Sequence, residues 1–355
     1  MVNKIFKPEF LRFSVIEQKE KYFQYIKFNS DVERYDTIQA QLKELIKNRY
    51  PKQILTQTEL VDLITDHLNG VEPEAYGVWV YYPWSKRLVH LLDENEFVEL
   101  RTVRNHYKIT HEEEQNLSTK KICIIGLSVG QSVALTLAME RCFGELRLAD
   151  FDMLDLSNLN RLRAGVHQIG LAKTIICARE IAEIDPFLKV TIFETGINEN
   201  NIDSFFTEGG LTDLLIEECD SLEIKVLARI KAKQYKVPVI METSDRGMLD
   251  IERYDLEPDR APFHGLIPEV HAAQLKEISS EKRMDYLLAI AGSDYLSERM
   301  KVSMLEMNRS ITGWPQLASS VVMGGGVAAE MSRKILLGQS KVSGRYYIDL
   351  DKIIS

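Results

Sequence analysis

The sequence has no long apolar run, and this absence bears on where the protein resides. A helix that crosses a bilayer needs about 20 consecutive apolar residues, and no stretch of the 355-residue sequence approaches that length. The first residues, MVNKIFKPEFLRF, also lack the apolar core of a signal peptide. We therefore expect a cytoplasmic protein that does not interact with membranes.

Cysteine is scarce and is never closely paired. The sequence holds only four cysteines, Cys123, Cys142, Cys177 and Cys219. Zinc knuckles and redox dithiols use C-x-x-C pairs, so this spacing offers neither kind of site. We expect these cysteines to be buried free thiols.

Basic residues are outnumbered by acidic ones, which gives a formal net charge of -9. Binding to nucleic acid depends on neutralising phosphates with a basic surface, so this balance argues against a nucleic-acid partner. With 45% hydrophobic and 27% charged residues, the composition is that of an ordinary globular protein. We expect a small-molecule or protein substrate.

Residues 1–105 predict a small accessory domain of α+β type. Helical spacing of apolar residues marks two segments, 35–49 and 58–68. Strand-like alternation, which predicts a small antiparallel sheet, marks three more: 78–82, 87–92 and 97–100. Five aromatic residues lie in or beside these strands, Tyr76, Trp79, Tyr81, Tyr82 and Trp84. They suit either a peptide-binding face or packing against the neighbouring domain.

Residues 106–355 alternate between strand and helix patterns. Buried-strand patterns occupy 121–125, 145–149, 189–193, 213–217 and 237–242, and helical patterns occupy 128–137, 172–184 and 222–235. Strands that alternate with helices of this length are joined by right-handed crossovers and form parallel sheets. We predict an α/β domain with a doubly wound, mostly parallel, Rossmann-like sheet.

The last hundred residues are less regular. They predict a strand over 248–254, helices over 272–309 with a break near Gly292, a long helix within 313–339, and a final strand over 345–349. Gly324-Gly325-Gly326 falls inside the long helix. Each helical glycine costs about 1 kcal/mol relative to alanine, so this run predicts either close backbone packing or a hinge.

Two glycines mark the turn between the first strand and the first helix of the α/β region. Gly126 ends the strand and Gly130 begins the helix, where backbone N–H groups and the helix dipole favour phosphate. The dinucleotide signature G-x-G-x-x-G would require a glycine at Ser128. A phosphate-binding turn and a plain tight turn both stay open.

The segment LADFDMLDLSNLNR, residues 148–161, follows the second strand. Asp150 lies where a carboxylate accepts hydrogen bonds from ribose hydroxyls in both dinucleotide and ATP sites. A nicotinamide cofactor has no triphosphate to hold, so the combination of Asn158, Arg161 and Lys173 favours ATP over NAD. The alternative is an acidic turn before a helix capped by Ser157 or Asn158.

Asp220 directly follows the fourth strand, in DLLIEECDS. Parallel strands end at the same edge of a sheet, so Asp220 should lie near Gly126 and Asp150. A carboxylate at that edge can hold Mg²⁺ beside phosphate oxygens. It can equally cap the helix over 222–235.

These segments resemble, in order and spacing, the ThiF/MoeB/ubiquitin-activating superfamily of ATP-dependent adenylating enzymes. The matching segments are 126–130, 148–161, GLAK at 170–173, 182–190 and DLLIEECDS at 213–221, and the resemblance runs from about Arg104 to the C-terminus. It implies an adenylyltransferase that uses ATP and Mg²⁺ to activate a carboxylate, either of a small acid or of a protein or peptide C-terminus. It also implies a homodimer.

The resemblance assigns roles to individual residues. Asp150 binds ribose, Asp152 supports the nucleotide loop, Asn158 and Arg161 contact phosphate, Lys173 neutralises the reacting phosphates, and Asp220 holds magnesium. The implied nucleotide-binding residues are Gly126, Ser128, Gly130, Asp150, Asp152, Asn158, Arg161 and Lys173; the implied catalytic residues are Arg161, Lys173 and Asp220.

The chain also departs from the superfamily. Ser128, Val129 and Gln131 stand where relatives have glycines, and the zinc-binding C-x-x-C pairs are absent. No cysteine follows Cys219, so we expect no thioester step on this chain. The superfamily motif R-Y-x-R-Q reaches into the partner subunit's site. In this chain the motif appears only in part, at residues 104–108. Arg101 or Arg104 would substitute for the arginine that the motif lacks here.

Residues 241–260 and the sequence FHGLIPE are similar to a bacterial ThiF-like subgroup whose longer members carry a nitroreductase-type flavin domain. This similarity suggests a separate flavoprotein partner. His264, in PFHGL, either touches substrate or packs within its loop. Two other functions stay open: a non-catalytic nucleotide-binding scaffold that partners another enzyme, and an NAD-dependent oxidoreductase.

Overall fold

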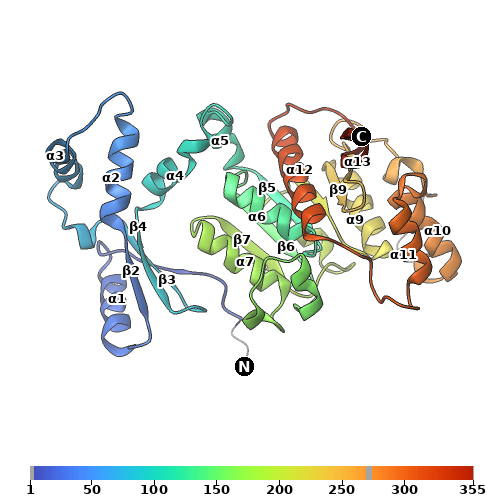
Figure 1. Ribbon diagram of the computed structural model, residues 1–355, viewed down its shortest axis with the longest axis horizontal. Coiled ribbons are helices and arrows are strands. Elements are labelled where there is room, and N and C mark those ends of the chain that lie inside the picture. The colour runs from blue at the N-terminus through green and yellow to red at the C-terminus, as the bar shows by residue number, and fades with distance from the viewer. Residues whose placement is uncertain (1–3, 269–273, 355) are drawn as a thin grey trace. The chain divides into compact units, whose positions relative to one another are not determined.

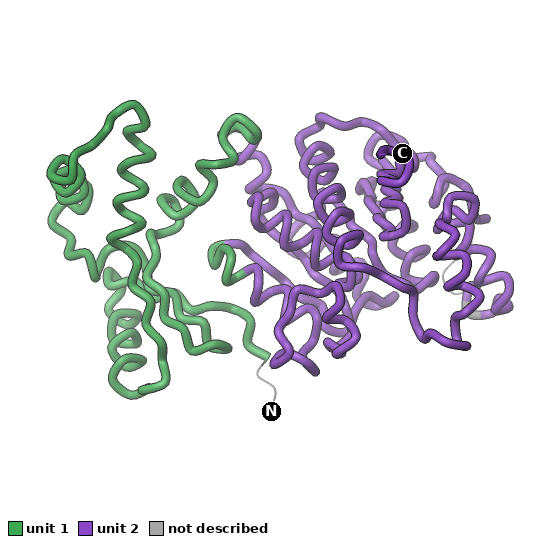
Figure 2. Tube along the Cα trace, viewed as in Figure 1, with its two compact units in different colours: residues 1–111, 182–187 green, residues 112–181, 188–355 purple. Residues whose placement is uncertain are grey.

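The computed structural model describes residues 4–268 and 274–354. The chain folds into two compact units, shown in Figures 1 and 2. The first unit comprises residues 1–111 and 182–187, and the second comprises 112–181 and 188–355. Our division at residue 105 did not anticipate that 182–187 group with the first unit.

The first unit combines four helices with a four-stranded sheet. The helices are α1 (Ile16–Phe28), α2 (Ile38–Arg49), α3 (Gln57–Leu68) and α4 (Glu94–Thr102). The strand order is β1 (Glu9–Leu11), β3 (Val78–Tyr82), β4 (Arg87–Leu91) and β2 (Glu33–Asp36). β3 and β4 pair antiparallel, as expected for 78–82 and 87–92, and β1 pairs antiparallel with β3. The strand β2, which was not predicted, pairs with β4 in parallel.

The strand expected over 97–100 is instead part of helix α4. The side chain of Asp93 accepts a hydrogen bond from the N–H of Glu94 at 2.8 Å, and Glu94 and Glu96 place negative charge in the first turn. A capping carboxylate and acidic residues at an N-terminus both stabilise a helix. These local signals outweigh the short alternation of apolar residues.

Of the five aromatic residues expected in or beside these strands, three are core residues and two, Tyr76 and Trp84, are partly exposed. Trp79, Tyr81 and Tyr82 on β3 are buried. The ring of Trp79 stacks on His90 with 4.1 Å between centroids. These three rings therefore belong to the core of the first unit, and packing of the aromatic cluster against the neighbouring domain stays a prediction.

The second unit is built on a seven-stranded sheet with the order β11-β10-β9-β8-β5-β6-β7. The strands are β5 (Lys121–Ile125), β6 (Glu145–Ala149), β7 (Lys189–Phe193), β8 (Leu214–Glu217), β9 (Val239–Thr243), β10 (Met248–Glu252) and β11 (Gly344–Tyr347). β5 to β9 are parallel, and β10 runs antiparallel to both its neighbours. The predicted doubly wound, mostly parallel sheet is confirmed.

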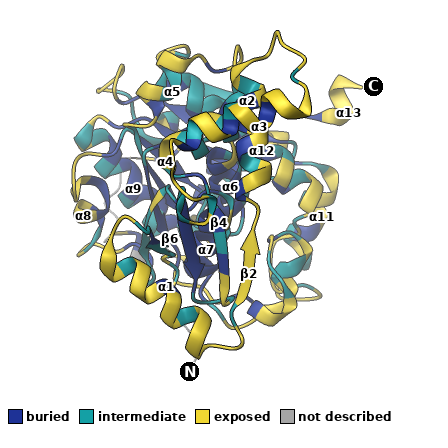
Figure 3. Ribbon diagram, turned by 90° about the vertical axis from the view of Figure 1, so that its left-hand side faces the viewer, coloured by how far each residue is buried: buried dark blue, intermediate teal, exposed yellow. Residues whose placement is uncertain are grey.

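Helices cover both faces of this sheet. They are α5 (His111–Leu117), α6 (Gly130–Glu140), α7 (Lys173–Ile184), α8 (Ile202–Thr207), α9 (Leu222–Tyr235), α10 (Ser280–Ala291), α11 (Glu298–Glu306), α12 (Ala318–Leu336) and α13 (Leu350–Ile353). α6 and α12 pack side by side. Met241 contacts α9 whereas its neighbour Glu242 contacts α12, so α9 and α12 lie on opposite faces. All residues of β6 and β8 are buried, and β6 is drawn dark blue in Figure 3.

The glycine run lies in α12 where that helix meets α6 and β9. A Cβ atom on Gly324 would overlap the carboxylate of Glu242. A Cβ atom on Gly325 would lie 2.7 Å from the Cβ atom of Ser132 in α6 and 2.9 Å from its carbonyl carbon. Close packing on the backbone of α6 therefore explains Gly325, and contact with the Glu242 side chain explains Gly324. The expected helices over 272–309 correspond to α10 and α11, although residues 272 and 273 lie outside the described residues.

Candidate functional site

A cavity of about 230 Å³ opens at the carboxyl ends of β5, β6 and β8. The chain continues from β5 to β6 on one side, whereas β8 lies on the other side of β5, so this is the point where strand order reverses. Open α/β sheets bind ligands at such a point. Eight predicted site residues line the cavity: Gly126, Ser128, Asp150, Asp152, Asn158, Arg161, Lys173 and Asp220.

Gly126 must be a glycine for two reasons. Its φ is +88°, in the left-handed region, and a Cβ atom there would lie 2.7 Å from the carbonyl group of Glu218. The glycine thus allows the turn after β5 to approach the loop after β8. Both segments contribute to the cavity because of this contact.

Gly130 makes a packing contact, and its nucleotide-binding role stays a prediction. It is buried and does not line the cavity. A Cβ atom on Gly130 would lie 2.8 Å from Cγ2 of Ile124, so the glycine lets helix α6 pack closely on β5. The sequence pattern could not separate this function from phosphate binding, since both place a glycine at the start of a helix.

Asp150 joins two of the loops that form the cavity. Its carboxylate accepts hydrogen bonds from the N–H of Leu127 at 2.7 Å and from the N–H of Asp152 at 2.8 Å. The residue is only 8% exposed, and burial raises the pKa of its carboxyl group. Asp150 therefore holds the glycine turn against the loop after β6, a structural function that the sequence did not reveal.

Lys173 and Asp152 form an ion pair at the edge of the cavity. The distance from Nζ of Lys173 to Oδ2 of Asp152 is 2.6 Å, and the N–H of Lys173 also donates to the carbonyl oxygen of Asp152 at 3.0 Å. Lys173 is 7% exposed, while Asp152 is exposed. The pair places the ammonium group at the first residue of α7, facing the cavity.

Asn158 belongs to a 3₁₀ turn over Leu156–Asn160. The N-cap of this turn is Asp155, whose N–H donates to Oδ1 of Asn158 at 3.0 Å. The expectation that Ser157 or Asn158 caps a helix is therefore wrong. The reciprocal bonds between Asp155 and Asn158 instead fix the turn that leads to Arg161.

Arg161 reaches from this turn to the loop after β5. Its Nε donates to Oγ of Ser128 at 2.9 Å, and its Nη1 donates to Oδ1 of Asn160 at 2.9 Å. Asn160 in turn donates to the carbonyl oxygen of Gln316 at 2.8 Å. Burial lowers the pKa of Arg161, while the charge of Asp220 raises it. The cavity thus presents a cation from this side as well as from Lys173.

Asp220 is an exposed carboxylate in the loop after β8. It does not cap α9, because the side chain of Ser221 accepts the N-cap hydrogen bond from the N–H of Ile224. Asp220 therefore faces the cavity without a capping function. No group of three His, Cys, Asp or Glu side chains forms a metal cluster anywhere in the described part of the chain. A metal here would draw its remaining ligands from a bound substrate and water, as Mg²⁺ commonly does.

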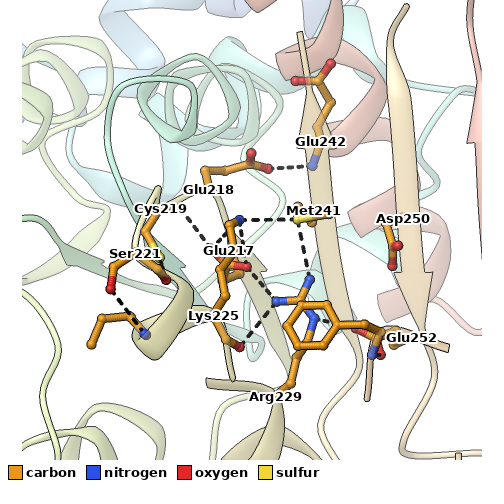
Figure 4. Close-up of polar contacts among 12 residues, drawn as sticks. Glu217, Glu218, Cys219, Ser221, Lys225, Arg229, Met241, Glu242, Asp250 and Glu252 are labelled. Atoms are coloured by element: carbon orange, nitrogen blue, oxygen red, sulfur yellow. Dashed lines mark hydrogen bonds and ion pairs between the residues drawn. The ribbon is translucent and has the colours of Figure 1, made fainter. Parts of the chain in front are cut away.

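A buried network of charges lies behind the loop that carries Asp220 (Figure 4). Glu217 bonds to Lys225 at 3.1 Å and to Arg229 at 2.5 Å, and Arg229 also bonds to Glu252 at 2.6 Å. Burial acts to raise the pKa of Glu217, but the charges of Lys225 and Arg229 lower it. Glu217 also accepts a hydrogen bond from the N–H of Cys219 at 2.9 Å, so the network fixes the loop backbone.

Several residues around the cavity had not been predicted. Glu218 and Cys219 line it, and burial together with Glu242 and Glu217 raises the pKa of Glu218 well above its usual range. The charged network had a sequence signal, because Lys225 and Arg229 are four residues apart on an otherwise apolar helix face. No sequence signal marked Gln316, because its position depends on the path that the chain takes before α12.

His264 lies outside this cavity and packs within its own loop. Its Nε2 is 2.9 Å from Oδ1 of the buried Asp250, and its Nδ1 is 2.7 Å from Nη2 of Arg260. Three cysteines are buried, Cys219 is partly exposed, and all four are free, in broad agreement with the prediction. Among the described residues, no helix is both long and apolar enough to span a bilayer.

Comparison with known proteins gives similarities to both sequences and structures. Residues 101–348 match the model described as the ThiF family. The Mycobacterium tuberculosis protein described as uncharacterized protein MT1398 is 43% identical over 82% of this chain and 42% of its own length. This chain therefore spans about two fifths of that relative.

Two tRNA-modifying enzymes show a more distant similarity. The tRNA threonylcarbamoyladenosine dehydratase of Bacillus subtilis is 22% identical, over 67% of this chain and 97% of its own. The crystal structure of the Escherichia coli tRNA N6-threonylcarbamoyladenosine dehydratase in complex with ATP matches with a TM-score of 0.50 and 18% identity. That match covers 70% of this chain and 98% of the enzyme, and it shows a shared fold.

Proposed function

The chain belongs to the ThiF family, and we propose that it is an ATP- and Mg²⁺-dependent adenylyltransferase that activates a carboxylate as an acyl adenylate. One observation carries the proposal. Arg161 and Lys173, from two separate segments, line the same cavity as Asp220. Two cations suit a triphosphate, and a carboxylate beside them suits the Mg²⁺ that accompanies it.

The proposed reaction requires positioning and charge stabilisation, with no nucleophile from the protein. An oxygen of the substrate carboxylate forms a bond to the α-phosphorus of ATP. The bond from that phosphorus to the oxygen bridging to the β-phosphate breaks, and pyrophosphate leaves with the electron pair. Lys173 and Arg161 would stabilise the charge that accumulates on the phosphate oxygens. Asp220 would hold Mg²⁺, which supplies further neutralisation when bound.

The remaining residues would orient the nucleotide. Asp150 uses one lone pair of each carboxylate oxygen for the backbone, which leaves each oxygen able to accept one more hydrogen bond, as from ribose hydroxyls. Asp152 would hold Lys173 in place, and Asn158 would shape the turn that presents Arg161. We propose that the reaction ends at the adenylate, without a thioester step on this chain.

Partners follow from the same proposal. We propose a homodimer, in which Arg101 or Arg104 would serve the partner's site, and a flavoprotein as a separate partner. The substrate would be a small acid or a protein or peptide C-terminus.

Nucleotide binding tests the proposal. Isothermal titration of the full chain should show binding of ATP with Mg²⁺ and much weaker binding of NAD. Lys173→Ala should weaken ATP binding at least about tenfold, because a charge-assisted bond to phosphate is worth about 1.5–3 kcal/mol. Lys189→Ala is the matched control, since Lys189 pairs with Glu145 and does not line the cavity.

Each alternative function predicts a different result. Preferential binding of NAD would support an oxidoreductase. Binding of ATP without turnover of any acid would support a non-catalytic scaffold. Equal ATP affinity in wild type and Lys173→Ala would remove the basis of the proposed site.

A further inference from the structure

A second cavity, of about 190 Å³, adjoins the first in the same unit. The two share the loop residues Glu218, Cys219 and Asp220, which line both. Any group bound in the second cavity therefore lies next to the ligand of the first. This continuity makes the second cavity the natural position for the acid that would react with ATP.

The walls of the second cavity are mainly apolar and unusually rich in methionine. Helix α10 contributes Met284, Leu287 and Leu288, helix α11 contributes Met300 and Met304, and the segment before α12 contributes Trp314. Both helices are labelled at the right of Figure 1, and both line this cavity. Methionine side chains are flexible and polarisable and adapt to aromatic and branched groups.

Polar groups gather where the two cavities meet. Gln316 lines the second cavity, and its Oε1 lies 3.4 Å from Oγ of Ser128, which lines the first. Ser128 in turn accepts the hydrogen bond from Nε of Arg161. An amide and a guanidinium at this boundary are suitable partners for a carboxylate. Burial keeps the pKa of Glu218 high, which limits electrostatic repulsion between Glu218 and a bound carboxylate.

We propose that the second cavity binds the apolar side group of the substrate, so that the substrate is a small carboxylic acid with an aromatic or branched aliphatic group. This inference rests on the proposed function, because it assigns the acid that ATP would activate. A cavity of about 150 Å³ holds one benzene molecule, so the observed volume suits a group of that size or slightly larger. A tail that ends in glycine would leave the apolar walls without a contact.

The test uses three probe acids and the full chain. Binding of acetate, 3-methylbutanoate and phenylacetate is measured by titration calorimetry, with and without ATP and Mg²⁺. Phenylacetate and 3-methylbutanoate should bind at least about tenfold more tightly than acetate, as expected from the apolar area that they bury. Equal affinities for the three acids would overturn the proposal.

Variants that fill the cavity locate the binding site. Met304→Trp should weaken binding of phenylacetate at least about tenfold. Leu305→Trp is the control, since Leu305 follows on the same helix but is 68% exposed and lies outside the cavity. Met284→Trp, on the other helix at an exposed position, repeats the test if Met304→Trp does not fold. Unchanged phenylacetate affinity in a folded cavity variant would overturn the proposal.

The two proposals fail in different ways. If the acids show the expected preference but ATP does not bind, the adenylyltransferase function is wrong while the apolar pocket stands. If ATP binds and the acids show no preference, the pocket assignment is wrong while the nucleotide site stands. Retained ATP binding in Met304→Trp would show that the variant has an intact first cavity.

Discussion

Replacing Gly325 by alanine should destabilise the protein, whereas the same change at Gly326 should not. A Cβ atom at position 325 would lie 2.7 Å from Cβ and 2.9 Å from the carbonyl carbon of Ser132. Ordinary carbon contacts are about 3.5–4.0 Å, so α12 would have to move away from α6 by about 1 Å. Because one of the opposing atoms belongs to the backbone, a side-chain rotation cannot relieve the overlap.

The expected magnitude follows from two opposing contributions. Overpacking of this kind costs about 1–3 kcal/mol, while alanine is favoured over glycine in a helix by about 1 kcal/mol. Gly325→Ala should therefore lower the free energy of unfolding by up to about 2 kcal/mol. A methyl group added at Gly326 would meet no described atom within 4 Å outside the adjacent backbone of its own helix, so Gly326→Ala should raise the free energy of unfolding by up to about 1 kcal/mol.

Urea denaturation followed by circular dichroism measures both variants. The midpoint should fall for Gly325→Ala and rise or stay constant for Gly326→Ala, at an unchanged slope. Gly324→Ala should lie between them, because the atoms nearest to the added methyl group belong to the carboxylate end of the Glu242 side chain and not to the backbone. Equal midpoints for the 325 and 326 variants would refute the packing explanation of the glycine run.

Three further predictions concern the carboxylates around the site. Glu217→Ala leaves the fully buried Arg229 without one of its two carboxylate partners. The variant should lose about 3–5 kcal/mol of unfolding free energy in chemical denaturation. Glu223→Ala, at a partly exposed ion pair, should lose under about 1 kcal/mol. Burial raises the pKa of Glu242 to about 8, so the folded state retains a proton that the unfolded chain loses above its ordinary pKa of about 4.3. The free energy of unfolding of the wild type should therefore fall as pH rises from about 4.5 to 8, by at most about 1.4 kcal/mol per pH unit from this group. Glu242→Gln should flatten this decrease. An identical pH profile of stability in the variant would contradict the raised pKa of Glu242. In calorimetry, Asp220→Asn should weaken binding of ATP in the presence of Mg²⁺, while binding of ATP alone should stay unchanged or improve. An equal loss of ATP affinity in both conditions would argue against a metal-binding function of Asp220.

The parallel sheet could be predicted because its strands are continuous apolar runs separated by helix patterns. Once strand ends are known, parallel geometry brings Gly126, Asp150 and Asp220 to one edge, and the structure places all three on one cavity. To predict that part of the site, only the order of the strands was required. The short strands β1 and β2 could not be predicted, since three or four residues carry no pattern without their pairing partners.

Other features depended on contacts between distant parts of the chain. Gly126 and Gly130 are alike in sequence, yet one faces the cavity and the other makes room for Ile124. The second cavity is formed by helices α10 and α11 and by Trp314 and neighbouring residues, whose positions no local pattern encodes. Sequence alone could therefore predict most of the residues that share the first cavity but not the apolar pocket beside them.

The most direct test of the central claim is acid-dependent exchange of labelled pyrophosphate into ATP. The full chain, with Mg²⁺ and an acid that binds to it, should incorporate label into ATP, and Lys173→Ala should lose that exchange. Exchange reports reversible formation of an acyl adenylate, because pyrophosphate must re-form ATP from that intermediate. Binding of both ATP and the acid without any exchange would contradict an adenylyltransferase and favour a non-catalytic scaffold.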